Sequence, residues 1–132
     1  MVKNKIKKIA AMAMAATVLV GTIGANTAFA ESKNATGYGT LKGTLSGSTT
    51  SGTGTTTVSK NTDNANITLA IDLKNSAGEN MVKTKFKSSR GVTIVKQDWS
   101  TSVKGITCAY GAHGVQGGTK YKADVVYTYS SL

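Results

Sequence analysis

The sequence contains no proline, a single cysteine (Cys108) and a single histidine (His113). One cysteine excludes any disulfide within the chain, so a folded domain must rely on a hydrophobic core. One Cys and one His cannot close a zinc site, and no loop has the acidic spacing of a calcium site. We therefore expect neither a metal nor a cofactor. Without proline, the edges of any sheet must be protected by other residues.

Acidic residues are also few, at 6 Asp and Glu in all, and none are placed as the carboxylate pair of a glycosidase. A G-x-S-x-G elbow is absent, and the glycines between 111 and 118 precede a strand, unlike those of a phosphate-binding loop. Cys108 and His113 are a possible thiolate–imidazolium pair. However, we expect Cys108 to face the core with Ile106 and Tyr110, and His113 to lie in a loop over residues 111–119. We therefore predict no catalytic residues and no enzymatic activity.

The first thirty residues have the organisation of a secretory signal peptide. A basic start is followed by an apolar run over residues 9–23 and by Ala28-Phe29-Ala30, the small-x-small pattern of a signal-peptidase site. We predict cleavage between Ala30 and Glu31, and hence a secreted, extracellular protein. The alternative, a retained anchor, is disfavoured because the run is short and broken by Gly21 and Gly24. No Cys stands directly after the cleavage site, as it would in a lipoprotein. We expect no transmembrane segment in the mature chain.

The mature chain is cationic. The full sequence has 16 Lys and Arg against 6 Asp and Glu, and four of the lysines lie in the leader, so 12 basic residues face 6 acidic ones, a net charge of +6 over residues 31–132. Outside a cell, such a surface attracts lipid headgroups, wall polymers and acidic polysaccharides. The simpler interpretation is a charge that keeps the protein soluble.

Residues 31–132 are expected to form one all-β domain. Short stretches with β-branched or alternating apolar residues are separated by Gly, Ser and Asn turns, and no helical period is present. They predict about seven strands, at residues 38–45, 55–60, 66–73, 81–87, 91–99, 103–110 and 120–129. We predict an antiparallel β-sandwich, with a flattened β-barrel as the alternative, and expect residues 31–36 to be frayed.

The clearest strand is the last one, at residues 120–129. Its alternation predicts that Tyr121, Val125 and Tyr127 face the core, while Lys122 and Asp124 face solvent. An aspartate in place of Val125 should then unfold the domain, because it would bury an unpaired charge.

Two sets of side chains are candidates for binding. The first is the row of Lys83, Lys85 and Lys87, about 7 Å apart on one side of a strand, with Arg90 nearby. A polyanion can follow such a spacing, although the row also suits an exposed face that guards an edge strand. The second is a set of aromatic residues that could include an exposed platform for sugar rings, although most of them are more simply core or rim residues. The set is Tyr38, Trp99, Tyr110, Tyr121, Tyr127 and Tyr129.

Two short motifs carry a resemblance. Gly37-Tyr38-Gly39 lies close behind the predicted cleavage site, and residues 122–129 form an aromatic closing strand. With the leader and the cationic, disulfide-free mature chain, they resemble the small exported bacteriocins of the lactococcin 972 type. That resemblance implies a β-sandwich and inhibition of Gram-positive cell-wall synthesis through binding of a wall precursor.

These observations favour a secreted, non-enzymatic β-sandwich that binds an anionic or cell-wall-associated target, with bacteriocin-like antimicrobial activity as the specific version. The expected partner is the cell envelope or another anionic polymer, with no specific nucleic acid. The alternative function is an extracellular structural protein that self-associates in a matrix through its sheet edges.

Overall fold

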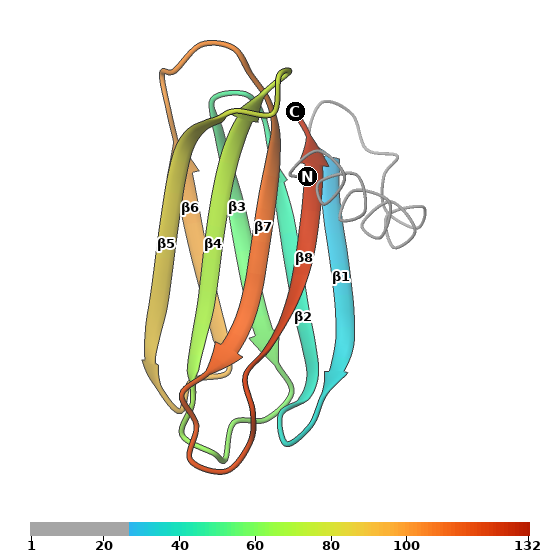
Figure 1. The fold of residues 1–132 in the computed structure, drawn as a ribbon, viewed down its shortest axis with the longest axis vertical. Helices are drawn as coiled ribbons and strands as arrows, with labels where there is room; N and C mark the ends of the chain where they lie inside the picture. Colours follow the sequence, from blue (N-terminus) through green and yellow to red (C-terminus); the bar gives the residue numbers. More distant parts are fainter. Residues whose placement is uncertain (1–26) are drawn as a thin grey trace.

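The computed structural model describes residues 27–132, which form eight β-strands and no helix. The strands are β1 (Thr27–Ala35), β2 (Gly39–Gly47), β3 (Ser51–Val58), β4 (Asn66–Asn75), β5 (Asn80–Arg90), β6 (Ile94–Ser100), β7 (Ile106–Gln116) and β8 (Asp124–Ser131). They form two four-stranded antiparallel sheets with the orders β1-β2-β3-β6 and β5-β4-β7-β8, stacked face to face (Figure 1). The predicted antiparallel sandwich is confirmed, with eight strands where about seven were expected; the sheets do not close into a barrel.

The additional strand is β1. Residues 31–35, expected to be frayed, instead pair with β2 from Glu31↔Gly43 to Ala35↔Gly39. Their polar composition resembles that of a linker, but the backbone ladder to β2 does not depend on side chains, and Ala35 is buried. The predicted cleavage site between Ala30 and Glu31 lies within β1, whereas most of the predicted signal peptide lies outside the described residues.

The core fills the space between the two sheets. β4, between β5 and β7, buries Ile67, Leu69, Ile71 and Leu73 on one face, as their alternation predicts. Leu41 and Leu45 of β2 lie on the inner face of the other sheet. Full burial of an aliphatic side chain of this size stabilises a fold by about 1.5–3 kcal/mol. The hydrophobic pattern of β4 therefore determines which face of its sheet is inside.

In β7 the buried face changes partway along the strand. Ile106 is buried, but from Ala109 to Val115 the odd-numbered residues face the core, and Gly114 is the one even-numbered residue that is buried. The register explains the change, because Lys74 pairs with Cys108 while Asn75 pairs with Ile106, which leaves Thr107 as an extra residue in a β-bulge. The prediction that Cys108 and Tyr110 face the core with Ile106 is therefore wrong.

The faces of β8 are the reverse of the prediction. Val126, Thr128 and Ser130 are buried, whereas Val125 is 36% and Tyr127 42% exposed. Tyr121 precedes the strand and packs against the edge of the core. The inward face carries Val126 and two hydroxyls, of which Thr128 pairs with the buried His113, whereas the outer face carries Val125, Tyr127 and Tyr129.

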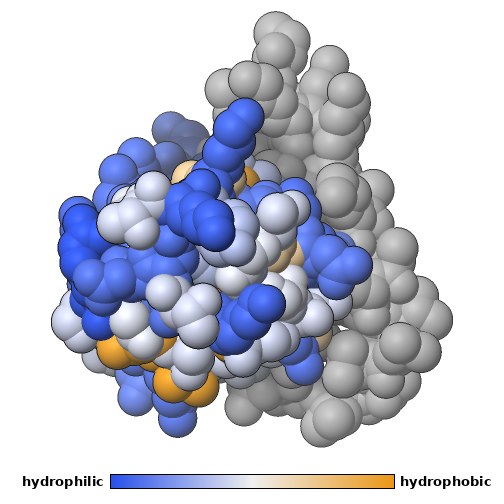
Figure 2. Space-filling model, turned by 90° about the horizontal axis from the view of Figure 1, so that it is seen from below, coloured by the Kyte–Doolittle hydropathy of each residue, from blue (hydrophilic) through white to orange (hydrophobic). Residues whose placement is uncertain are grey.

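One end of the sandwich is tied together by a buried carboxylate. Asp63, in the connection between β3 and β4, accepts hydrogen bonds from the hydroxyls of Tyr38 and Thr119 and from the backbone N–H groups of Lys120 and Tyr121. These donors come from the β1–β2 turn and the β7–β8 connection, which lie at the same end (Figure 1). Gly37 is needed beside Tyr38, since its φ is +87° and a Cβ there would overlap the Tyr121 ring. From this end the surface is mostly hydrophilic, with hydrophobic residues confined to small areas (Figure 2).

Candidate functional site

The outer face of the β5-β4-β7-β8 sheet brings together residues that sequence reasoning had treated separately. We call this surface the lysine–tyrosine face. Register places its residues in three rows that cross the four strands from β5 to β8. These rows are Lys83–Asp72–Tyr110–Tyr129, Lys85–Ala70–Ala112–Tyr127 and Lys87–Thr68–Gly114–Val125. Each row starts at a lysine and ends at an aromatic or aliphatic residue.

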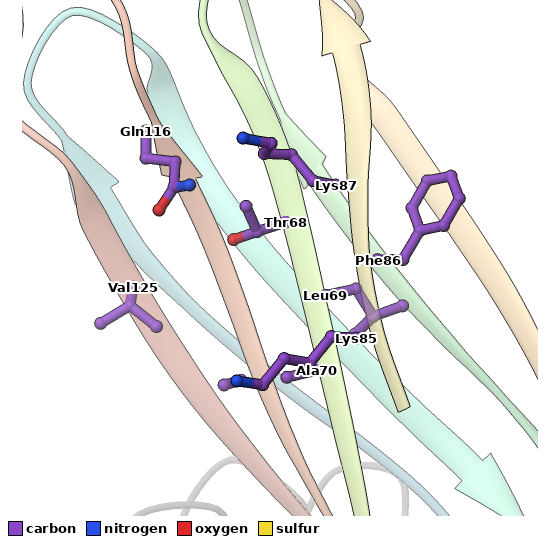
Figure 3. A pocket seen from close by; sticks show the side chains of 9 residues that line it. Thr68, Leu69, Ala70, Lys85, Phe86, Lys87, Gln116 and Val125 are labelled. Carbon is purple, nitrogen blue, oxygen red and sulfur yellow. The ribbon is translucent and has the colours of Figure 1, made fainter. Parts of the chain in front are cut away.

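The three lysines lie as the sequence predicted. Lys83, Lys85 and Lys87 alternate along β5, are exposed, and share one side of this edge strand. Lys85 and Lys87 extend from β5 across β4, while Phe86 points away from them (Figure 3). The row therefore protects the sheet edge and, at the same time, places positive charge over the face.

The centre of the face is shallow because its residues are small. Ala70 of β4 lies beside Ala112 of β7, and Thr68 lies beside Gly114. A hollow of about 430 Å³ lies over this floor, between Lys85 and Lys87 on one side and Val125 and Gln116 on the other (Figure 3). In the second and third rows, small residues in the central strands lie between longer ones on β5 and β8, and this part of the face is an open groove.

Tyrosines form the far side. Tyr127 is exposed, and the rings of Tyr110 and Tyr129 pack against each other with centroids 5.0 Å apart. The ammonium of Lys74 lies 5.6 Å from the centre of the Tyr110 ring, and these three side chains line a second hollow of about 340 Å³. Burial raises the pKa of both Tyr110 and Tyr129, so these phenols stay protonated at neutral pH.

The sequence offered these tyrosines among the candidates for an exposed aromatic platform, but it favoured the core for Tyr127. Val125 and Tyr127 were assigned to the core because they alternate with polar residues. One signal was available: on the other parity, Val126, Thr128 and Ser130 also offer an aliphatic side chain and short hydroxyls that fit between sheets. Because either face of β8 could be buried, its partner strands determine which face lies inside.

The other two predicted site residues lie elsewhere. Arg90 donates to the backbone carbonyls of Asn64 and Gly117, and so joins two connections at the end of the sandwich. Trp99 belongs to the other sheet and is only 7% exposed, in the core. Its indole occupies space that Gly47 and Gly52 leave open. Neither residue is part of the lysine–tyrosine face, and Trp99 is no exposed platform for sugars.

His113 is a buried strand residue rather than part of a loop. Its Nδ1 lies 3.0 Å from the Thr56 hydroxyl and its Nε2 lies 2.7 Å from the Thr128 hydroxyl. The Thr56 hydroxyl donates to the carbonyl of Thr68, so it accepts from Nδ1–H and leaves Nε2 to accept from Thr128. Burial lowers the pKa of His113 to about 4, with a backbone hydrogen bond to Thr55 acting in the opposite direction. The imidazole is therefore neutral at pH 7.

Cys108 and His113 point to opposite sides of β7, since they are five positions apart in an extended strand. Cys108 is half-buried beside Tyr110 on the outer side, and burial raises the pKa of its thiol. The two groups do not form a pair. Within residues 27–132, no three His, Cys, Asp or Glu side chains are grouped as metal ligands would be.

Comparisons with family models, with curated proteins and with solved structures give no match for this chain. None of the residues from Thr27 onward belongs to a helix that is long and apolar enough to cross a membrane.

Proposed function

We propose that this is a secreted, non-enzymatic binding protein whose target is an anionic polymer of the cell envelope. The observation that carries the proposal is the row of Lys83, Lys85 and Lys87. The three lysines are exposed on one side of β5, at a spacing of about 7 Å between alternate residues, and Lys85 and Lys87 line the hollow. Asp72 is the one acidic residue in the three rows, so the groove is predominantly positive.

Electrostatic attraction of this kind acts over a limited distance. The Debye length falls from about 10 Å at 0.1 M salt to about 3 Å at 1 M, so exposed ammonium groups lose most of their attraction at high salt. The net charge of +6 over residues 31–132 adds general attraction, and the groove concentrates it on one face. Binding should therefore be strong at low salt and weak at high salt.

A more specific version is bacteriocin-like growth inhibition of Gram-positive cells. It is supported by the resemblance of Gly37-Tyr38-Gly39 and of the last strand to the lactococcin 972 type, and by the cationic groove. In this version the anionic target is a component of the growing cell wall.

The second candidate is a self-associating matrix protein. It is favoured by apolar side chains on the side of the sandwich where β5 and β6 are the edge strands (Figure 1). Phe86 is 43% and Ile94 57% exposed there. On the opposite side, an ion pair of 2.7 Å between Lys33 and Asp124 joins β1 to β8. Exposed apolar residues at sheet edges promote association between copies.

Three measurements separate these functions. Purified Gram-positive walls should sediment the mature protein at 50 mM salt and release it at 1 M. Growth of Gram-positive cells in the presence of the protein tests the bacteriocin version. Analytical ultracentrifugation should show a monomer; concentration-dependent oligomers together with salt-insensitive wall binding would favour the matrix protein instead.

A further inference from the structure

We infer that the anionic polymer is an acidic polysaccharide, which the lysine–tyrosine face contacts with lysines along one side and tyrosines along the other. This inference rests on the proposed function and names the chemical class of the target. It is carried by the rows that connect each lysine to an aromatic or aliphatic residue across the same sheet.

The width of the face suits a single polymer chain. Lys85 and Tyr127 are the two ends of one row, separated by Ala70 and Ala112. With strands about 4.8 Å apart, three steps place their Cα atoms roughly 14 Å apart. Lys85 reaches inward over β4, which narrows the open floor (Figure 3). A chain of sugar rings lying along the strands would touch the lysines on one edge and the tyrosines on the other.

Tyr127 offers a contact to sugar rings that binding by charge alone does not require. It is exposed on the outer face, where its ring faces solvent. Sugar rings present C–H groups on their faces and hydroxyls at their edges, and a tyrosine matches both with an apolar ring and a polar tip. Tyr110 and Tyr129 extend this aromatic surface along β7 and β8. A polyanion without rings would leave these side chains unused.

Asp72 distinguishes a polysaccharide from other polyanions. It lies between Lys83 and Tyr110 in the first row. A carboxylate accepts hydrogen bonds from sugar hydroxyls, which can offset its repulsion of the acid groups. The backbones of polyphosphate and DNA have no hydrogen-bond donor, so Asp72 only repels them. Replacing Asp72 by Asn removes the repulsion but also the charge-assisted acceptor, so it should strengthen binding of polyphosphate more than binding of an acidic polysaccharide.

The experiment compares four probes by fluorescence anisotropy or calorimetry at 50 mM salt. Polygalacturonate supplies charge, rings and hydroxyls; polyphosphate supplies charge alone; dextran supplies rings and hydroxyls without charge; single-stranded oligo-dT represents nucleic acid. We expect polygalacturonate to bind at least about fivefold more tightly than polyphosphate or oligo-dT at matched charge concentration, and dextran to bind weakly.

Two variants and one control complete the test. Tyr127→Ala should weaken polygalacturonate binding about fivefold without changing polyphosphate binding, and Asp72→Asn should strengthen polyphosphate binding more than polygalacturonate binding. Thr55→Ala, on the outer face of the other sheet, should change neither. Circular dichroism verifies that each variant is folded.

The outcomes separate the two proposals. If polyphosphate or oligo-dT binds as tightly as polygalacturonate and Tyr127→Ala has no effect, the target is a polyanion recognised by charge, and the inference is wrong while the proposed function stands. If no anionic probe binds at low salt, the proposed function itself is wrong.

Discussion

The hydroxyl of Tyr38 donates a 2.8 Å hydrogen bond to Oδ2 of Asp63, which joins the β1–β2 turn to the connection before β4. Burial on its own would raise the pKa of Asp63, but the hydrogen bonds from the Tyr121 N–H, the Tyr38 and Thr119 hydroxyls and the Lys120 N–H hold it at about 2. Burial and the neighbouring carboxylate raise the pKa of Tyr38 to about 12. The Gly-Tyr-Gly motif is thus a structural anchor in this fold.

The first prediction tests this anchor. Tyr38→Phe should lower the free energy of unfolding by about 2 kcal/mol, because it removes a hydrogen bond to a charged acceptor inside the protein. Urea denaturation at pH 7 measures the change. Tyr127→Phe is the matched control, since Tyr127 lies on the surface, and it should leave the midpoint unchanged. Equal midpoints for the two variants would show that the anchor does not stabilise the fold.

The second prediction concerns the pH dependence of stability. The pKa of His113 is lowered from 6.5 to about 4 in the folded state, so the unfolded chain takes up its proton at a higher pH than the folded chain does. The stability that neutral His113 contributes is therefore fully present above pH 6.5, and this contribution is lost as the pH falls toward 4. The loss is on the order of 3 kcal/mol, at about 1.4 kcal/mol per pKa unit. Asp63 acts in a separate window, below pH 3.8, because its folded pKa is also lowered.

Two measurements check this. His113 is the only histidine in the sequence, so its imidazole C–H resonances can be followed by NMR as a function of pH, and their midpoint should be near 4. Urea denaturation at pH 7 and pH 4.5 should give a lower midpoint at the acidic pH. A titration midpoint near 6.5 would place His113 in solvent and contradict its position between the two sheets.

The third prediction uses two neighbouring residues of β8. Val125→Asp should remain folded, because the side chain is on the outer face, whereas Val126→Asp should lose more than about 4 kcal/mol of stability by burying an unpaired charge. Thermal melts followed by circular dichroism distinguish them. An unfolded Val125→Asp with a folded Val126→Asp would mean that the faces of β8 are those expected from the sequence alone.

The fourth prediction concerns the space above the His113 ring. A Cβ added at Gly43 would lie 2.2 Å from Cγ of His113, and the ring is held in place by hydrogen bonds to Thr56 and Thr128. Gly43→Ala should therefore destabilise the fold by about 2 kcal/mol through overpacking. Thr44→Ala, the next residue on the outer side of β2, should change stability by less than about 1 kcal/mol. Similar midpoints for both variants would show that the two sheets can separate at little cost.

Much of the architecture follows from local pattern. β4 was predictable because Ile67 to Leu73 alternate without interruption, and a strand of this kind has one possible inner face. β5 was predictable because its lysines alternate with the uncharged residues Val82, Thr84 and Phe86. Where one face is clearly charged or clearly aliphatic, the sequence determines both the strand and its orientation.

The rest depended on contacts distant in sequence. The inner face of β8 is set by Thr128, because its buried hydroxyl finds a hydrogen-bonding partner in His113. The inner face of β7 changes at Thr107, where the bulge is set by pairing with β4. The lysine–tyrosine face could not be predicted from the sequence because its lysines and tyrosines meet only through the register of four strands.

The most direct test of the proposed function removes three positive charges from the lysine–tyrosine face in one variant and from other surfaces in a second variant, so that both variants have the same net charge. In one variant Lys83, Lys85 and Lys87 are replaced by Gln; in the other, Lys42, Lys96 and Lys104, which are exposed outside the lysine–tyrosine face, are replaced in the same way. Sedimentation with purified Gram-positive walls at 50 mM salt is measured for both. We predict at least about a tenfold loss of affinity for the first variant and less than about a threefold loss for the second. Equal losses would show that net charge alone drives the interaction, and would contradict a binding groove on this face.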